Sequence, residues 1–461
     1  MIRLADRAAL LSLLLAGCTT TPHLAPAPAT LSVAYRAAQP GGVGEFWSSL
    51  DDPLLMRYLQ IANSQNLDLA AALARLGQAR AIAQGARAAL APELRATLSA
   101  ARQQNSIASG IPLQPRDTNT FDATFDAAWE LDIFGRLRAE ARAARGDVAA
   151  AALDLQALRI TTRAETARLY YAARATQLRI EVLDHAADAQ SDLAQLAASR
   201  ARAGLVPETD ALRARGLAAS SRAAAAALRA DLADTIAALA LILGRTAASV
   251  GPELDTRLDL PRARSPLLGA PADLLTRRPD VRRDLARLEA ADARAAARAR
   301  DRLPRLTLSA TGGYSAAATA TLFTPGAQVL GIGAALAGPV VDFGRRKAVA
   351  RQAEAIADER AANLRATVLT AVREVERDAA ALSSTNLQLE ARAEEIADNR
   401  AVAASLRRRY LAGLDDFTAA LDAERVALAS ADAEILARRA QIDAALSLWK
   451  SVGGPLDQSP P

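Results

Sequence analysis

A strict alternation of apolar and polar side chains over residues 121–133 limits the folds that are open to this chain. One side of the alternation is apolar, whereas the other carries Asp122, Asp126 and Glu130. A period of two over this length predicts a β-strand with one apolar and one acidic face. Because a strand needs about 9 to 11 residues to cross a bilayer, this segment is long enough to do so.

Three further segments show the same alternation, at residues 94–100, 306–311 and 330–336, and the last is interrupted by Gly331 and Gly333. A soluble sandwich with one wet face is the alternative that these strands leave open. In lipid, however, strands must close into a barrel, because an open edge leaves backbone groups unsatisfied. The smallest such barrels have about eight strands, so four strands predict that several copies share one barrel.

The chain also repeats itself at a fixed offset. Phe134 and Phe343 lie 209 residues apart, as do Gly204 and Gly413, and Pro92 and Pro304 lie 212 apart. Such self-similarity indicates two tandem halves with the same order of elements.

Each half carries the pattern of a medium helix, two strands, a very long helix and a returning helix. The long helices are expected at residues 136–202 and 345–411, and each spans roughly 100 Å at 1.5 Å per residue. Glycine turns at Gly204 and Gly413 predict the tips of two helical hairpins. Three copies would then supply a twelve-strand barrel and a twelve-helix cylinder, although the helices alone also fit an ordinary coiled coil.

The composition excludes several classes of function. Charged residues make up 23% of the chain, the formal net charge is +5, and the two signs are interspersed, which indicates solvated helix faces and no nucleic-acid partner. The two histidines, His23 and His185, have no Cys, Asp or Glu at ligand spacing. We therefore expect no catalytic residue, no metal and no cofactor.

The N-terminal region is typical of a secretory signal. Arg3 and Arg7 precede a short apolar stretch that ends in Gly17 and Cys18, the only cysteine of the chain. The last residues before the cysteine resemble a lipoprotein cleavage box, so we expect Cys18 to carry a covalent lipid. A buried free cysteine is the alternative. Similarity to Gram-negative lipoproteins, with Thr19 in place of an aspartate, implies sorting to the outer membrane.

These features predict one order of regions along the chain. The regions are a signal peptide (1–17), a lipid-anchored tether (18–50), a first repeat (51–250), an equatorial connector (251–273), a second repeat (274–453) and a tail (454–461).

Four motifs resemble those of one family. They are AWELDIFGRLR at 128–138, LLTRRPDV at 274–281, GPVVDFGRR at 338–346 and LWKSVGG at 448–454. Together they resemble the TolC-like outer-membrane efflux proteins, in the NodT-type lipoprotein branch. The resemblance implies a homotrimer with a β-barrel in the outer membrane and an α-helical barrel extending into the periplasm. It also implies the exit duct of a tripartite efflux pump, a passive channel for small molecules such as drugs. An inner-membrane transporter would drive this channel through a periplasmic adaptor.

The resemblance and the strand pattern together name candidate site residues. The periplasmic gate of the family falls on Asp422 and Thr418, and the tips at Gly204 and Gly413 are expected to dock the adaptor. Arginines near the tip, such as those at 407–409, are candidates to hold Asp422 from neighbouring helices. The alternative for Asp422 is an acid that interacts with the positive end of a helix. The strand alternation itself places Phe121, Phe125 and Trp129 against lipid.

Three other readings of the chain remain open. The first is an outer-membrane channel of a type I secretion system. The second is a periplasmic adaptor lipoprotein, which would lack the amphipathic strand pairs and the duplication. The third is a helical scaffold without membrane strands.

Overall fold

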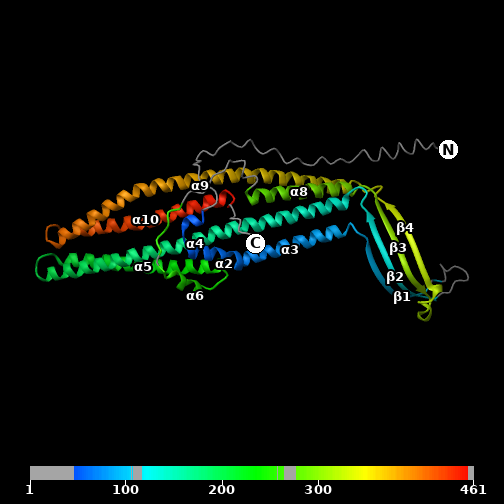
Figure 1. Cartoon of the computed structure of the whole chain (residues 1–461), viewed down its shortest axis with the longest axis horizontal. Helices are drawn as coiled ribbons and strands as arrows, with labels where there is room; N and C mark the ends of the chain where they lie inside the picture. Colours follow the sequence, from blue (N-terminus) through cyan, green and yellow to red (C-terminus); the bar gives the residue numbers. More distant parts are fainter. Residues whose placement is uncertain (1–45, 105, 107–116, 257, 264–276, 455–461) are drawn as a thin grey trace. The chain divides into compact units, whose positions relative to one another are not determined.

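The computed structural model describes residues 46–104, 106, 117–256, 258–263 and 277–454 (Figure 1). Among these, residues 75–152 and 283–365 form one compact unit, which we call the sheet unit. Residues 46–74, 153–282 and 366–454, as far as they are described, form a second, which we call the hairpin unit. Cys18, the signal peptide and most of the tether lie outside the described residues.

The elements follow the order that the sequence predicts. In the first half they are η1 (Ser48–Leu50), α2 (Pro53–Gln65), α3 (Leu67–Ala88), β1 (Glu93–Gln104), β2 (Asp117–Leu131), α4 (Arg136–Arg202) and α5 (Glu208–Ile242). Between the halves lie α6 (Ala247–Val250) and η3 (Gly251–Leu254). In the second half they are α8 (Pro279–Arg300), β3 (Arg305–Ala316), η5 (Thr319–Thr321), η6 (Pro325–Ala327), β4 (Gln328–Ala337), α9 (Arg345–Leu411) and α10 (Phe417–Ser451).

The two halves match in the lengths and spacing of their longer helices and of strands β1 and β3, whereas β2 has 15 residues and β4 has 10. Helices α4 and α9 have 67 residues each, α5 and α10 have 35 each, and the bounds of both pairs lie 209 residues apart. Helices α3 and α8 have 22 residues each, strands β1 and β3 have 12 each, and their bounds lie 212 apart. Both predicted long helices are confirmed to the residue.

The sheet unit contains one four-stranded antiparallel sheet in the order β1-β2-β3-β4. Phe125 of β2 lies opposite Ala96 of β1 and Gly312 of β3, and Ala310 of β3 lies opposite Ile332 of β4. Within the described residues, the outer edges of β1 and β4 have no further strand beside them. The four predicted strands are therefore confirmed, and the sheet ends in two open edges.

The two faces of this sheet differ sharply in chemistry. Leucine, isoleucine, phenylalanine, alanine and tryptophan predominate on one face between the rows of Leu131 and Phe121, and Phe125 is 62% exposed there. On the other face, the Asp126 carboxylate accepts hydrogen bonds from the hydroxyls of Thr97 and Thr311, at 3.0 and 2.8 Å. These bonds cross from β1 through β2 to β3. The acids of the polar face are thus hydrogen-bonded by the neighbouring strands, whereas most large side chains of the apolar face stay exposed and Phe323 packs edge-on against Tyr314.

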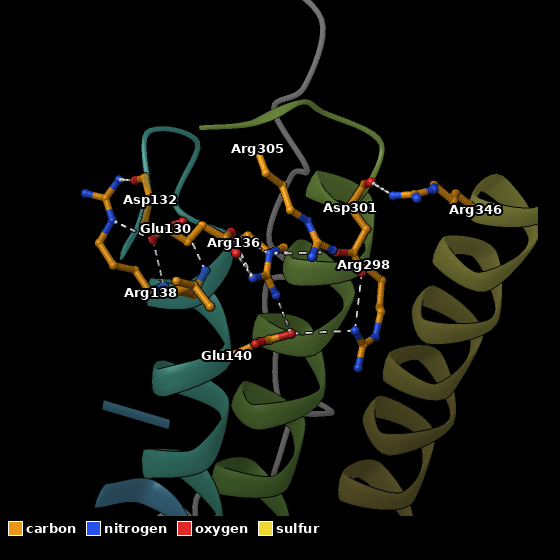
Figure 2. Close-up of polar contacts among 10 residues, drawn as sticks. Glu130, Asp132, Arg136, Arg138, Glu140, Arg298, Asp301, Arg305 and Arg346 are labelled. Atoms are coloured by element: carbon orange, nitrogen blue, oxygen red, sulfur yellow. Dashed lines mark hydrogen bonds and ion pairs between the residues drawn. The ribbon is translucent and has the colours of Figure 1, made fainter. Parts of the chain in front are cut away.

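Ion pairs fix the point where strand β2 becomes helix α4 (Figure 2). The Arg136 guanidinium donates to Glu130 at 2.9 Å and to Glu140 at 3.2 Å, and it lies 3.8 Å from Asp301 at the end of α8. The carboxylate of Asp132 accepts the backbone N–H groups of residues 137 and 138, which satisfies the first turn of α4. The same cluster therefore sets the start of α4 and joins the first half to the second.

Aromatic side chains form the core of the hairpin unit. Trp449 packs edge-on against Trp47 at 4.8 Å between ring centres, and Tyr58 packs against Tyr170 at 5.9 Å. Arg174 lies over the Tyr170 ring and donates to the carbonyl oxygen of residue 254 at 2.6 Å, which ties the start of the connector to α4. Among the described helices, none is both long and apolar enough to cross a membrane.

Candidate functional site

Each hairpin turns at a glycine in the left-handed region. Gly204 and Gly413 both have φ of 74°, which residues with a Cβ atom rarely adopt. In both turns the glycine N–H and the next N–H donate to carbonyls of the preceding helix at 2.9–3.0 Å, the Schellman pattern. The following residues, Leu205 and Leu414, are exposed. Each tip is therefore a rigid turn that presents a leucine.

The two tips pack together through one apolar cluster. Tyr410 at the end of α9 meets Phe417 at the start of α10, with 5.4 Å between ring centres. The buried members of the cluster come from all four helices and are Leu193, Ala194, Ala197, Ala211, Ala214, Tyr410, Phe417 and Ala420. Small alanines on α4 and α5 leave room for the two aromatic rings, so the hairpins are held by shape at this end.

A single arginine of the first hairpin caps the long helix of the second. Arg200 donates to the carbonyl oxygens of Tyr410 and Leu411 at 3.0 and 2.9 Å, and its guanidinium lies 4.8 Å from the centre of the Tyr410 ring. These carbonyls belong to the last turn of α9, where the Tyr410 carbonyl also accepts the N–H of Gly413 at 3.0 Å. The bond pair thus connects the hairpins and satisfies a helix end at once.

The candidate gate residues lie beside this cluster on α10, with Thr418 between its members Phe417 and Ala420 and Asp422 just after them. Asp422 and Thr418 are one turn apart and both exposed, and the Asp422 side chain is 64% exposed. Arg425 is 3.8 Å from Asp422 on the same helix. Asp416 occupies the N-cap and accepts the N–H of residue 419 at 2.7 Å, whereas no acid lies in the first turn. The acid that interacts with the positive end of α10 is therefore Asp416. Asp422 lies beyond the first turn, where the effect of the helix dipole has faded.

The arginines near the tip have partners other than Asp422. Arg407 lies 3.7 Å from Glu424, and Arg409 donates to Asp415 at 2.5 Å. The pKa of Glu424 is raised because burial disfavours its charged form, and Arg407 offsets only part of this effect. Within one chain, these contacts do not support the expectation that residues 407–409 hold Asp422.

The strand residues expected against lipid share one face. Phe121, Phe125 and Trp129 lie on the apolar side of β2, and Trp129 is the residue nearest the helices. Its indole N–H donates to the carbonyl oxygen of Leu90 after α3 at 2.9 Å. Trp129 therefore combines an apolar ring with a fixed polar end, as aromatic residues do at a membrane–water boundary.

No group of three or more His, Cys, Asp or Glu side chains in the described residues could hold a metal ion. His185 is largely exposed and lies 3.4 Å from Glu181, four residues earlier on α4, so the prediction that no acid lies at ligand spacing from it is wrong for Glu181. The lipidation candidate, Cys18, lies outside the described residues.

Comparison with known proteins identifies this arrangement. The family model described as outer membrane efflux protein matches residues 58–245 and 270–454. The chain belongs to this family. It is 31% identical to the pyoverdine export outer membrane protein OpmQ of Pseudomonas putida, over 96% of each chain. It is 29% identical to nodulation protein T of Rhizobium leguminosarum bv. trifolii, over 79% of each chain. The structure of the outer-membrane channel OprN matches with a TM-score of 0.82 and 29% identity, over 92% of this chain and 94% of that one.

Membership confirms the predicted family and its location in the outer membrane. This outer membrane efflux protein is the exit duct of an efflux system, and proteins of this family are channels rather than enzymes. The adaptor and scaffold readings of the sequence are thereby wrong. The fold that the family shares is a mostly helical chain with a four-stranded sheet, as observed.

Sequence reasoning missed the residues that join the two tips of the efflux protein. Arg200 lies in an alternating run of small and charged residues. No feature of the neighbouring sequence predicts that it stacks on Tyr410 or donates hydrogen bonds to α9. Tyr410 and Phe417 offered one, because aromatics make up only 3% of the chain and these two flank a tip glycine. Two aromatics on either side of a turn are well placed to pack together.

Proposed function

We propose that three copies of this chain form one passive duct, with a twelve-stranded barrel in the outer membrane and a twelve-helix barrel below it. The observation that carries the proposal is the four-stranded sheet with one apolar face, one polar face and two open edges. An open edge in lipid leaves backbone groups unsatisfied, so β4 of one copy must meet β1 of the next.

The direction of the strands favours this closure. The order β1-β2-β3-β4 is antiparallel throughout, so β1 and β4 run in opposite directions. Any number of copies could therefore join with antiparallel pairs. Two copies would give a barrel filled with side chains, whereas three give twelve strands around a wet lumen. The polar face, with Asp122 and Asp126, would line that lumen, and Phe121, Phe125 and Trp129 would face lipid.

The hairpin tips are the proposed docking points for partners. Gly204 and Gly413 hold rigid turns that present Leu205 and Leu414, and these exposed leucines could give apolar contacts to the helical hairpins of a periplasmic adaptor. The adaptor would connect the duct to an inner-membrane transporter that supplies the energy. The cargo would be small molecules such as drugs, in line with the export of pyoverdine in the name of one relative.

Asp422 and Thr418 are the proposed gate of the periplasmic end. Three copies of Asp422 around an axis would bring like charges together in a wet constriction, and carboxylate rings favour cations. The exposure of Asp422 within one chain and its place beyond the first turn of α10 support a side chain that is free to point into a lumen.

The proposal includes the lipid anchor and the order of regions. A signal peptide at 1–17 would be removed, Cys18 would be acylated, and residues 18–50 would tether the anchor to the first repeat at 51–250. The connector at 251–273, the second repeat at 274–453 and the tail at 454–461 complete the chain.

The mass of the detergent-solubilised protein, together with cryo-EM, tests the assembly. We expect three-fold symmetry and one barrel shared by all copies. A second measurement is migration on a gel before and after heating, since a closed barrel resists detergent until it is heated. A monomer with its own closed barrel, or a helical bundle with no strands in the micelle, would overturn the proposal.

A further inference from the structure

A groove lies between helices α8 and α9 of the sheet unit. Its volume of about 440 Å³ suits a small molecule. The charged residues that line it are Arg287, Arg294 and Arg298 of α8, Arg360 of α9 and Asp147 of α4. Its apolar residues come from both helices and include Ala291, Val349, Ala353 and Ile356. The groove therefore combines an excess of positive charge with an apolar surface.

A series of contacts places the groove on the side of the helices that continues the polar face of the sheet (Figure 2). Glu130, on the polar face of β2, accepts hydrogen bonds from Arg136 in the first turn of α4. Arg136 also donates to Glu140, one turn later, and Glu140 lies 3.5 Å from Arg298 of the groove. In the proposed duct the polar face lines the lumen, so the groove opens toward the same lumen.

The two arginines nearest the sheet are held by acids. Arg294 forms an ion pair with Asp147 of α4, and Arg298 lies 3.3 Å from Asp301, just after the end of α8. These pairs neutralise part of the positive charge at this end. What the groove can bind therefore depends mainly on the two arginines at its other end.

Those two arginines lie at the same level on different helices. Arg287 lies 13 residues before the end of α8, and Arg360 lies 15 residues after the start of α9. Because α8 runs toward the sheet and α9 runs away from it, both lie roughly 20 Å from the ends of their helices at the sheet. Arg287 is 3.6 Å from Asp284 and Arg360 is 3.8 Å from Glu359, and the arginine side chains are 40% and 42% exposed. Ion pairs of this length in contact with water are weak, so an anion in the groove can compete for both guanidinium groups.

The first half of the chain shows that the helices do not need these charges. Three of the four arginines have uncharged counterparts at the offsets of 212 and 209 residues, which are Ile82, Ala86 and Ala151. Arg287 alone has a basic counterpart, Arg75. Helices α3 and α4 nevertheless have the same lengths as α8 and α9. Helix formation therefore does not explain the arginines of the groove.

We infer that this groove binds organic anions on their way through the duct, namely molecules that join a carboxylate, sulfonate or phosphate to an apolar body. The inference rests on the proposed function, since the groove must open into a lumen. Arg287 and Arg360 bind the anionic group from two helices, because the N–H groups of a guanidinium match the oxygens of such anions. The apolar residues between them and the sheet cover the body of the molecule.

The groove offsets the acidic character of the sheet for this class of cargo. Asp122 and Asp126 lie on the polar face of β2, and carboxylates that line a lumen disfavour anions. A band of arginines next to this face gives an anion a favourable position before it passes the acids. The partial exposure of Arg287 and Arg360 keeps this binding weak, as a passive duct requires, since cargo must also leave.

Equilibrium binding to the trimer tests the inference. The probe is naphthalene-2-sulfonate, the trimer is embedded in nanodiscs of phosphatidylcholine, and calorimetry measures the Kd with empty nanodiscs as the blank. Arg287→Ala with Arg360→Ala should raise the Kd about tenfold or more, because two charge-assisted contacts are lost. Arg75→Ala, at the position that corresponds to Arg287, is the matched control and should leave the Kd unchanged. The uncharged naphthalene-2-sulfonamide should bind the wild type as weakly as the sulfonate binds the double variant.

The possible results separate this inference from the proposed function. Equal Kd values for the wild type and the double variant would show that the two arginines bind no anion. Equal binding of the sulfonate and the sulfonamide would show that the charge is not recognised. Either result would overturn the inference and leave the trimer intact, whereas the absence of a trimer in the wild-type sample would overturn the proposed function.

Single-channel recordings test whether the groove opens into the lumen. Naphthalene-2-sulfonate should reduce the current through the wild-type trimer in a planar bilayer, and the double variant should need about tenfold more probe for the same reduction. The sulfonamide should have little effect on either protein. A probe that binds the groove in nanodiscs but leaves the current unchanged would place the groove outside the duct and overturn the inference.

Discussion

The guanidinium of Arg200 lies 4.8 Å from the centre of the Tyr410 ring and also donates hydrogen bonds to the carbonyl oxygens of Tyr410 and Leu411. The two residues belong to different halves of the chain. The end of α9, and with it the tip at Gly413, is therefore held by the neighbouring hairpin as well as by its own turn.

Arg200→Ala should loosen the second tip. Hydrogen bonds from a charged donor contribute about 1.5–3 kcal/mol each, and the stacking adds roughly 0.5–1 kcal/mol. We expect faster hydrogen exchange of the backbone amides at residues 410–414, with little change in the sheet unit. Arg202→Ala, which removes an exposed arginine of the same turn, is the control. Equal exchange in both variants would show that the contact does not restrain the tip.

Asp422→Ala should widen the proposed gate and remove its charge. Single-channel recordings in planar bilayers should show a higher conductance and a lower preference for cations, with an unchanged yield of trimers. Thr418→Ala, one turn earlier on α10, removes no charge and should have the smaller effect. Unchanged conductance and selectivity after Asp422→Ala would place the gate elsewhere.

Two neighbouring alanines of β2 allow a matched test of the sheet faces. Ala127 lies on the apolar face, opposite Ala310, and Ala128 lies on the polar face, opposite Ser309. A charge on the lipid side costs about 2–4 kcal/mol at mid-depth, so Ala127→Arg should reduce the amount of assembled protein in the outer membrane. Ala128→Arg should assemble more fully. The reverse order would mean that the polar face meets lipid.

Glu424 should make stability depend on pH. Burial raises its pKa above the ordinary value of 4.5, so the folded protein holds this proton more tightly than the unfolded chain. The free energy of unfolding must then fall as the pH rises from about 4.5 through the raised pKa. Glu424→Gln should remove this decline, as measured by thermal unfolding at several pH values. Asp422→Asn, at an exposed carboxylate of the same helix, should leave the decline in place.

Cys18→Ser should abolish acylation. Growth with a labelled fatty acid should mark the wild-type protein only, since a serine has no thiol to accept the diacylglycerol. Thr19→Ser serves as the control and should be labelled like the wild type. Label on the Cys18→Ser protein would contradict the lipid anchor.

Local patterns were sufficient to predict the elements of this protein. The long helices are predicted at 136–202 and 345–411 and are found there. Each follows a strand and ends at a tip glycine, so little freedom remains for its two bounds. The strands follow from alternation, and the weak β4, with Gly331 and Gly333, was supported by its place in the repeat. The repeat itself fixed the order of elements in the second half.

Contacts between distant segments could not be predicted in the same way. Arg200 and Tyr410 are 210 residues apart, and nothing in a helical run of small and charged residues selects one arginine as a cap. The arginines at 407–409 are candidates to hold Asp422, yet within one chain Arg407 lies beside Glu424 and Arg409 beside Asp415. Which of several nearby acids an arginine contacts depends on the three-dimensional geometry, which the composition of the segment does not predict.

The 209-residue spacing of α5 and α10 leaves one consequence for how such a duct could diversify. Thr418 has Thr209 as its counterpart in the first half, whereas Asp422 has Arg213, a residue of opposite charge. If a ring were built from copies of a chain of half this length, every copy would place the same side chain at the position of Asp422. In the proposed ring of three copies the two halves of each chain differ at this position, so a mutation at 422 would change three positions and leave the alternate three as they are.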